Sequence, residues 1–226
     1  AFRQYKELAL CIALNLHYLC RLKSKESMSV EIKIVPKTKK ELRKFVEFGT
    51  DLYKGNAYFV PPLKFDEVNT LNPAVNPAFE FCEAEYFMAF RDGKPVGRIG
   101  AIINRKVNEK DHKQELRFGF VDFIDDAEVS TALFDAAIAW GKKRGMTEII
   151  GPLGFTDMDC EGMLVEGFDQ LSTMATIYNY PYYASHLERM GFEKKTDWVE
   201  FKMTVPDAIP EKHLRIGEIV KKKYGL

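Results

Sequence analysis

The chain has 226 residues, 46% of them hydrophobic and 29% charged, which is an ordinary globular composition and excludes disordered, collagen-like and fibrous proteins. Its 33 basic and 33 acidic residues give a formal net charge of zero, without the basic excess of a dedicated nucleic-acid-binding protein. The four cysteines form no CxxC pair and have no histidine at ligand spacing, so we expect no metal site and no disulfide framework. Single thiols favour a cytoplasmic protein, and we expect neither nucleic acid nor a membrane as its partner.

The two ends of the chain look separate from its centre. Residues 8–20 form a mostly apolar run of 13 residues, shorter than the roughly 20 needed to span a bilayer, and no A-x-A-like cleavage site follows. We therefore predict that residues 1–27 are an appended segment, either an amphipathic helix or sequence upstream of a start at Met28, that adds little to the core. Pro206 and Pro210 break the pattern again, so residues 206–226 are predicted to be a linker or the start of a following domain.

Between these ends, strand-like and helix-like periods alternate. Short apolar or alternating runs predict strands at 29–36, 84–91, 94–104, 117–124, 148–151 and 192–204. Helical spacing predicts helices at 39–53, 125–144 and 182–190, and a short one that begins at Pro62. Asp92-Gly93 between two apolar runs is a strong hairpin signal.

The helix at 125–144 has the clearest signals. Acidic residues occupy its first turn, basic residues its last, and Gly145 ends it. Leu133 and Trp140 lie on its apolar stripe, so we expect both to be buried against a sheet. The order of elements predicts an α/β fold, with a mixed central sheet of six or seven strands, helices on both faces, and a β-α-β crossover after antiparallel hairpins.

Three segments resemble the GNAT superfamily of N-acetyltransferases. HLERMGFEKKTDWVEFKM (186–203) resembles its last helix and strand, DGKPVGRIGAIIN (92–104) its central hairpin, and DAEVSTALFDAAIAWGKKRGMTEIIG (126–151) its cofactor-side helix and the strand after it. The resemblance covers residues 28–205. The phrases GPLGFT, EGMLVEGF and NYPYY are similar to a poorly characterised bacterial branch in which a second domain follows. The resemblance to this superfamily implies an N-acyltransferase with acetyl-CoA or another acyl-CoA as co-substrate and a small-molecule or peptide amine as acceptor.

The resemblance also implies where acyl-CoA binds. Its wedge lies between the strands at 117–124 and 148–151, and its pyrophosphate sits on N–H groups at the start of the next helix. The cofactor contacts that this implies are Phe123, Ile124, Val129, Ser130, Thr131 and Asn179. The turn departs from the family's Arg/Gln-x-x-Gly-x-Gly/Ala pattern, because Asp125 replaces the base and Glu128 the first glycine. The turn's acids can instead be simple helix caps.

Catalytic candidates come from the same comparison and from a charge pattern. The family often has a tyrosine four residues before the glycine of a Gly-Phe pair; here that position is Leu187, so Tyr182 and Tyr183 are the candidates to protonate a leaving thiolate. Residues 145–188 contain no lysine or arginine and seven acids, which favours a cationic amine acceptor. Glu161 or Asp159 then accepts its proton. His186 is expected on the exposed face of its helix.

Two function classes stay open. The first is an acyltransferase that moves an acyl group from acyl-CoA to an amine. The second is a degenerate, non-catalytic GNAT-like module that binds a ligand or packs against a following domain.

Overall fold

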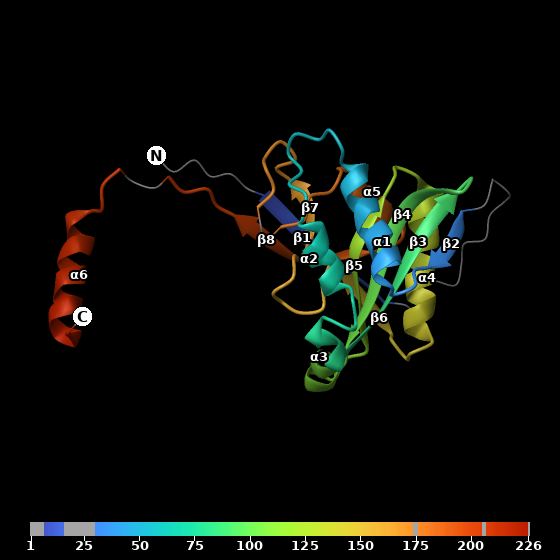
Figure 1. Cartoon of the computed structure of the whole chain (residues 1–226), viewed down its shortest axis with the longest axis horizontal. Coiled ribbons are helices and arrows are strands. Elements are labelled where there is room, and N and C mark those ends of the chain that lie inside the picture. The colour runs from blue at the N-terminus through green and yellow to red at the C-terminus, as the bar shows by residue number, and fades with distance from the viewer. Residues whose placement is uncertain (1–6, 16–29, 174–175, 205–206, 226) are drawn as a thin grey trace.

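The computed structural model describes residues 7–15, 30–173, 176–204 and 207–225, with side chains from residue 30 onward. Its centre is one mixed sheet (Figure 1). The strands are β1 (Glu7–Asn15), β2 (Glu31–Ile34), β3 (Cys82–Arg91), β4 (Lys94–Asn104), β5 (Glu115–Phe123), β6 (Glu148–Gly151), β7 (Met163–Glu166) and β8 (Glu193–Glu200). Their order is β2-β3-β4-β5-β6-β1-β7, with β8 paired to β1, and only β5 and β6 run parallel.

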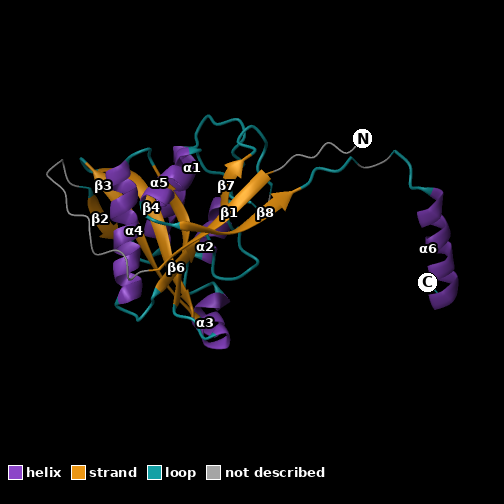
Figure 2. Cartoon of the chain, turned by 180° about the vertical axis from the view of Figure 1, so that it is seen from behind, coloured by secondary structure: helices purple, strands orange, loops and turns teal. Residues whose placement is uncertain are grey.

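Helices cover both faces of this sheet, as predicted. They are α1 (Lys39–Leu52), α2 (Lys64–Thr70), α3 (Arg105–Asp111), α4 (Ala127–Lys142), α5 (Tyr182–Arg189) and α6 (Glu211–Tyr224), with a 3₁₀ turn at Pro77–Glu80. α1 lies in front of the sheet in Figure 1, and α4 covers the opposite face in Figure 2. Each face therefore has its own apolar core, one built with α1 and α2 and the other with α4 and α5.

The central signals in the sequence correspond to observed elements. Asp92 and Gly93 both have positive φ, 52° and 74°, as the turn of a two-residue hairpin requires. Asp126 caps α4, because its side chain accepts the N–H groups of Glu128 and Val129. The predicted burial of Leu133 and Trp140 is confirmed, with 0% and 8% of each exposed.

The N-terminal segment departs from its prediction. Glu7–Asn15 is strand β1 and not part of a helix, and it lies between β6 and β7, antiparallel to β6, β7 and β8. A short apolar run fits a buried strand as well as a helix, and periodicity alone does not separate the two. This strand raises the sheet to eight strands. The rest of the predicted segment, residues 1–6 and 16–27, lies outside the described residues.

The C-terminal half holds two elements that the patterns did not predict. β7 forms within the acidic stretch, and α6 forms within residues 206–226 without one buried residue. The boundaries of the domain and of any following domain stay predictions. No helix in the described ranges is long and apolar enough to cross a membrane.

β5 positions the candidate site, because this strand separates from the neighbouring strand β6 partway along its length. It pairs with β6 over only three residue pairs, the last being Arg117 with Ile150. It also bulges against β4, since Phe120 and Val121 together face Ile99, and Phe120 has a φ of 47°. The wedge predicted between these two strands is therefore present.

Candidate active site

A cavity of about 270 Å³ opens where β5 leaves β6. Its walls come from α1, α2 and the segment before α2, from β5, from the loop at 152–160, from residues 172 and 176–179, and from Tyr183 of α5. Apolar side chains form much of the wall, among them Phe59, Val60, Leu63, Phe120, Val121, Met163 and Ile177. The polar and charged side chains that line it include Tyr53, Asp66, Glu67, Arg98, Asp122, Asp159, Asn179 and Tyr183. A largely apolar cavity with a few convergent polar groups is the usual form of a small-molecule site.

Two tyrosines from opposite faces of the sheet meet one carboxylate in this cavity. The hydroxyl of Tyr53, the residue directly after α1, donates to Asp122 Oδ1 at 2.8 Å and lies 2.9 Å from the hydroxyl of Tyr183 on α5. Tyr183 lies 3.3 Å from the same carboxylate oxygen and accepts the backbone N–H of Phe123 at 3.1 Å. The gap between β5 and β6 lets α5 reach through the sheet to α1.

Arg98 fixes the other side of this carboxylate. Its Nε donates to Asp122 Oδ2 at 2.7 Å, and its Nη1 donates to Glu67 Oε1 at 2.8 Å. Nη1 also donates to the carbonyl of Phe45 at 3.1 Å. All three charged side chains are at most 10% exposed. A buried charge needs such partners, so this network ties α1 and α2 to β4 and β5 around the cavity.

Burial sets the protonation state of the tyrosines and the arginine. It raises the pKa of Tyr53 and of Tyr183 well above the usual tyrosine value, and the Asp122 carboxylate raises both further. Burial acts to lower the pKa of Arg98, but Glu67 and Asp122 outweigh it, so the pKa rises. At neutral pH the phenols are therefore hydrogen-bond donors and the guanidinium is charged.

The predicted catalytic residues separate into two groups. Tyr183 and Asp159 line the cavity. Tyr182 does not line it, and its hydroxyl donates to the carbonyl of Phe123. Glu161 is likewise absent from the lining found among the described residues, and burial raises the pKa of its carboxyl. The structure thus brings one tyrosine and one carboxylate of the four candidates together.

The predicted cofactor residues lie mostly outside the cavity. Asn179 is the exception, and its side chain also bonds the backbone of Leu164 and Tyr180. The side chains of Phe123, Val129 and Ser130 are fully buried, and a cofactor contact by these three residues stays a prediction. Ile124 donates its N–H to Val96, and Thr131 donates its hydroxyl to the carbonyl of Ala127.

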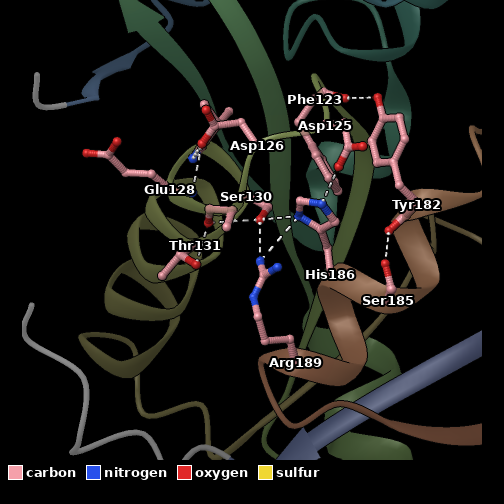
Figure 3. Close-up of polar contacts among 12 residues, drawn as sticks. Phe123, Asp125, Asp126, Glu128, Ser130, Thr131, Tyr182, Ser185, His186 and Arg189 are labelled. Atoms are coloured by element: carbon pink, nitrogen blue, oxygen red, sulfur yellow. Dashed lines mark hydrogen bonds and ion pairs between the residues drawn. The ribbon is translucent and has the colours of Figure 1, made fainter. Parts of the chain in front are cut away.

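The turn before α4 is engaged by the protein itself (Figure 3). Asp126 Oδ1 accepts the N–H groups of Glu128 and Val129 at 2.9 and 3.2 Å. Arg91 forms ion pairs with both Asp126 and Glu128, and its hydrogen bond lowers the pKa of the Asp126 carboxyl. For Asp126, the helix-cap interpretation is confirmed.

A second polar array joins α4 to α5 at the same turn. His186 Nδ1 lies 2.8 Å from Ser130 Oγ, and its Nε2 lies 2.9 Å from Asp125 Oδ1 (Figure 3). Arg189 donates to Ser130 Oγ at 3.3 Å. Only 4% of His186 is exposed, so its expected exposure is wrong. Since Ser130 is also fully buried, this array is a structural link and not a nucleophilic site.

Five of the polar and charged cavity residues named above were not predicted from the sequence: Tyr53, Asp66, Glu67, Arg98 and Asp122. A signal existed for two of them. Asp122 interrupts the apolar strand RFGFVDFI, and Arg98 interrupts KPVGRIGAIIN. A charged residue in a strand covered on both faces must find a buried partner, and such partners often belong to a site.

No group of three or more potential metal ligands occurs among the residues that the structure describes.

Comparison with known proteins gives relatives that are longer than this chain. The chain is 36% identical over 169 residues to Protein YghO from Escherichia coli, which covers 75% of the chain and 43% of that protein. It is 30% identical over 188 residues to the bacterial ceramide synthase of Caulobacter vibrioides, which covers 82% of the chain and 49% of that protein. The chain thus spans less than half the length of either relative. No family model matches it.

Solved structures with a similar fold include two at low identity. One is a conserved Staphylococcus epidermidis protein of unknown function, with 11% identity and a TM-score of 0.46, covering 85% of this chain and 60% of that one. The other is a GCN5-related N-acetyltransferase from Kribbella flavida, with 14% identity and a TM-score of 0.42, covering 85% and 56%. The mixed sheet with helices on both faces is the α/β architecture that the sequence predicted. TM-scores this low leave the function to the geometry of the site.

Proposed function

We propose that this GNAT-like domain transfers an acyl group from an acyl-CoA-type thioester to a primary amine, with the cavity between β5 and β6 as its active site. One observation carries the proposal: Tyr53 and Tyr183 direct their hydroxyls to Asp122 inside a cavity that opens where two parallel strands part. Preorganised donors in a water-poor cavity are what acyl transfer requires, because charge develops on the carbonyl oxygen and on the leaving sulfur.

The chemistry assigns roles to the cavity residues. The amine nitrogen attacks the thioester carbonyl carbon, the C–N bond forms, and the C–S bond breaks. Asp159 accepts the proton that the ammonium group must lose, directly or through water. Tyr183 stabilises the departing thiolate as a hydrogen-bond donor, since its raised pKa makes it a weak acid. The bulge at Phe120 and Val121 places backbone groups on the cavity wall for the carbonyl oxygen.

Charge and apolar surface favour an acceptor amine with a long apolar chain. Four carboxylates line the cavity, Asp66, Glu67, Asp122 and Asp159, against the one guanidinium of Arg98, and this excess of negative charge attracts a cation. Val60 and Leu63 line the cavity and still expose 50% and 64% of their surface, so its apolar wall continues to the outside. A ceramide is an amide of a long-chain amino alcohol, so the name of the Caulobacter relative agrees with this class of acceptor.

The direct test is amide formation by the purified chain. Acetyl-CoA and palmitoyl-CoA are each incubated with sphinganine, a short alkylamine and a peptide amine, and both the released thiol and the amide are measured. We expect the amide with the long-chain amine. Tyr183→Phe should lower kcat/KM by about 100-fold or more, the scale of a positioned proton or hydrogen-bond donor.

Tyr182→Phe is the matched control, because Tyr182 neighbours Tyr183 but bonds the backbone of Phe123 outside the cavity. It should change kcat/KM by less than about threefold. An equal loss of kcat/KM in both variants would contradict the role proposed for Tyr183. No amide with any pair of substrates would refute the transferase.

A non-catalytic module is the second candidate, and the turn before α4 favours it. Asp126 and Arg91 already satisfy groups that an active acyl-CoA enzyme would direct to phosphate. The same assay separates the candidates, because such a module binds a thioester or an amine in a thermal-shift titration and forms no amide.

A further inference from the structure

The start of α4 is where a nucleotide-bearing donor would place its phosphates. β5 leads from the cavity directly to this helix, and a helix N-terminus with open N–H groups attracts anions. A donor whose thioester lies in the cavity therefore extends its other end toward this turn.

Most of the N–H donors of this turn already have acceptors within the protein. The N–H groups of Glu128 and Val129 bond the Asp126 side chain, and that of Ser130 bonds the Asp126 carbonyl. The N–H of Asp126 bonds the carbonyl of Ile124 at 2.7 Å. Four of the five N–H groups of residues 126–130, all but that of Ala127, thus have acceptors within the turn region itself.

The charged side chains at the turn oppose a phosphate as well. Asp125 is 67% exposed and, with Asp126 and Glu128, places three carboxylates at the helix end. Arg91, the cation nearest to two of them, is held by both Asp126 and Glu128. A pyrophosphate here meets like charges and displaces existing bonds.

The gap between β5 and β6 offers a different way to recognise the donor. Past Arg117, β5 has no residue of β6 paired with it, although the Phe118 carbonyl still accepts the N–H of Leu153 at 2.8 Å. Beyond that bond, Phe120 to Asp122 of the strand line the cavity. A pantetheine arm carries two amide groups, and an extended chain of amides can pair with an open strand edge. The pantetheine arm of a donor is the same whether or not a nucleotide is attached to it.

We propose that the donor is recognised through its acyl-pantetheine thioester, and that the pyrophosphate and nucleotide of CoA contribute nothing to its binding. The proposal rests on the proposed function, since it concerns the donor of that reaction. The turn before α4 instead serves as an internal anchor, where Asp125 and Ser130 hold His186 of the helix that carries Tyr183.

Calorimetric titration of the whole chain with CoA and with pantetheine tests this without turnover. We expect dissociation constants within about threefold of each other. A phosphate held by charge-assisted hydrogen bonds would make CoA tighter by about tenfold or more, and that result overturns the proposal. Failure of both ligands to bind overturns it too.

Two variants at one position separate the cap from its charge. Asp126→Gly removes the carboxylate and frees the N–H groups of Glu128 and Val129, whereas Asp126→Ser removes the charge and keeps a capping oxygen; both residues are tolerated at this position of a helix. We expect Asp126→Gly to bind CoA about tenfold tighter than pantetheine, and Asp126→Ser to keep the two nearly equal. An unchanged ratio in Asp126→Gly contradicts the inference.

Turnover distinguishes this inference from the proposed function. Palmitoyl-pantetheine and palmitoyl-CoA should give kcat/KM values within about threefold of each other. Equal binding of both without amide formation refutes the transferase and leaves the mode of recognition intact.

Discussion

Replacing Gly49 with alanine should destabilise this protein, although such a change within a helix normally stabilises. Gly49 lies in α1 beside the guanidinium of Arg98. A Cβ at this position would lie 2.1 Å from Arg98 Nη2 and 2.3 Å from Cζ. No real contact is that short, so either Arg98 or α1 must move.

The magnitude follows from what holds Arg98. Its bonds to Glu67, Asp122 and Phe45 leave it no alternative buried position, so the clash breaks a buried ion pair. Breaking such a pair costs about 3–5 kcal/mol, and the helix preference of alanine returns about 1 kcal/mol at most. We expect a net loss of about 2–4 kcal/mol in the free energy of unfolding, or a fall in Tm of about 4–16 °C.

Equilibrium denaturation in urea, with thermal unfolding beside it, measures this loss. Gly217→Ala in α6 is the matched control, because a Cβ there meets no atom within 4 Å and should not lower the midpoint. In a double-mutant cycle, Gly49→Ala should cost nothing once Arg98→Ala has removed the clash. An unchanged or higher midpoint for Gly49→Ala alone would refute the reasoning.

Three further outcomes are expected. Gly119→Ala places a Cβ 2.3 Å from the Leu153 carbonyl at the wedge, so it should cost about 1–3 kcal/mol and lower thioester binding, measured by denaturation and calorimetry; binding equal to the parent's would contradict this. Removal of residues 1–27 deletes β1 from the sheet, so a chain that starts at Met28 should melt at a lower temperature; the unchanged midpoint that the sequence patterns favour is the opposing result. Because burial raises the pKa of Tyr53 and Tyr183 above their unfolded values, their contribution to stability is complete below about pH 10 and is lost as the pH rises toward the folded pKa. In a titration to high pH, the absorbance of tyrosinate should therefore rise together with unfolding. Ionisation of the two buried phenols while the protein stays folded would contradict this prediction.

Local signals in this sequence were sufficient for several of its helices and strands, but not for β1, β7 or α6. Asp92-Gly93 predicted the β3–β4 hairpin because both residues accept positive φ. The acids of the turn at 125–128 predicted where α4 begins, and the Asp126 side chain accepts the first helical N–H groups there. Caps and turns depend on interactions between residues that are a few positions apart, so the sequence pattern alone can predict them.

Segment 7–15 shows a case in which the local sequence pattern did not determine the structure. An apolar run of this length fits a helix or a buried strand, and its place next to β6 is a matter of the whole sheet. The acidic turn was similar, since three carboxylates predict a cap or a spoiled phosphate site equally well. Arg91 decided between them from a distant hairpin by pairing with Asp126 and Glu128.

The site itself was decided by tertiary structure. Tyr183 could be named from its neighbourhood in the sequence, but its partner Tyr53 lies 130 residues away, at the end of a helix on the opposite face. They meet at Asp122 because β5 separates from β6, and that separation leaves room through the sheet. Composition and periodicity determine which residues are buried and in which element. Which buried polar groups satisfy one another depends on the crossing of those elements in space, which no local spacing encodes.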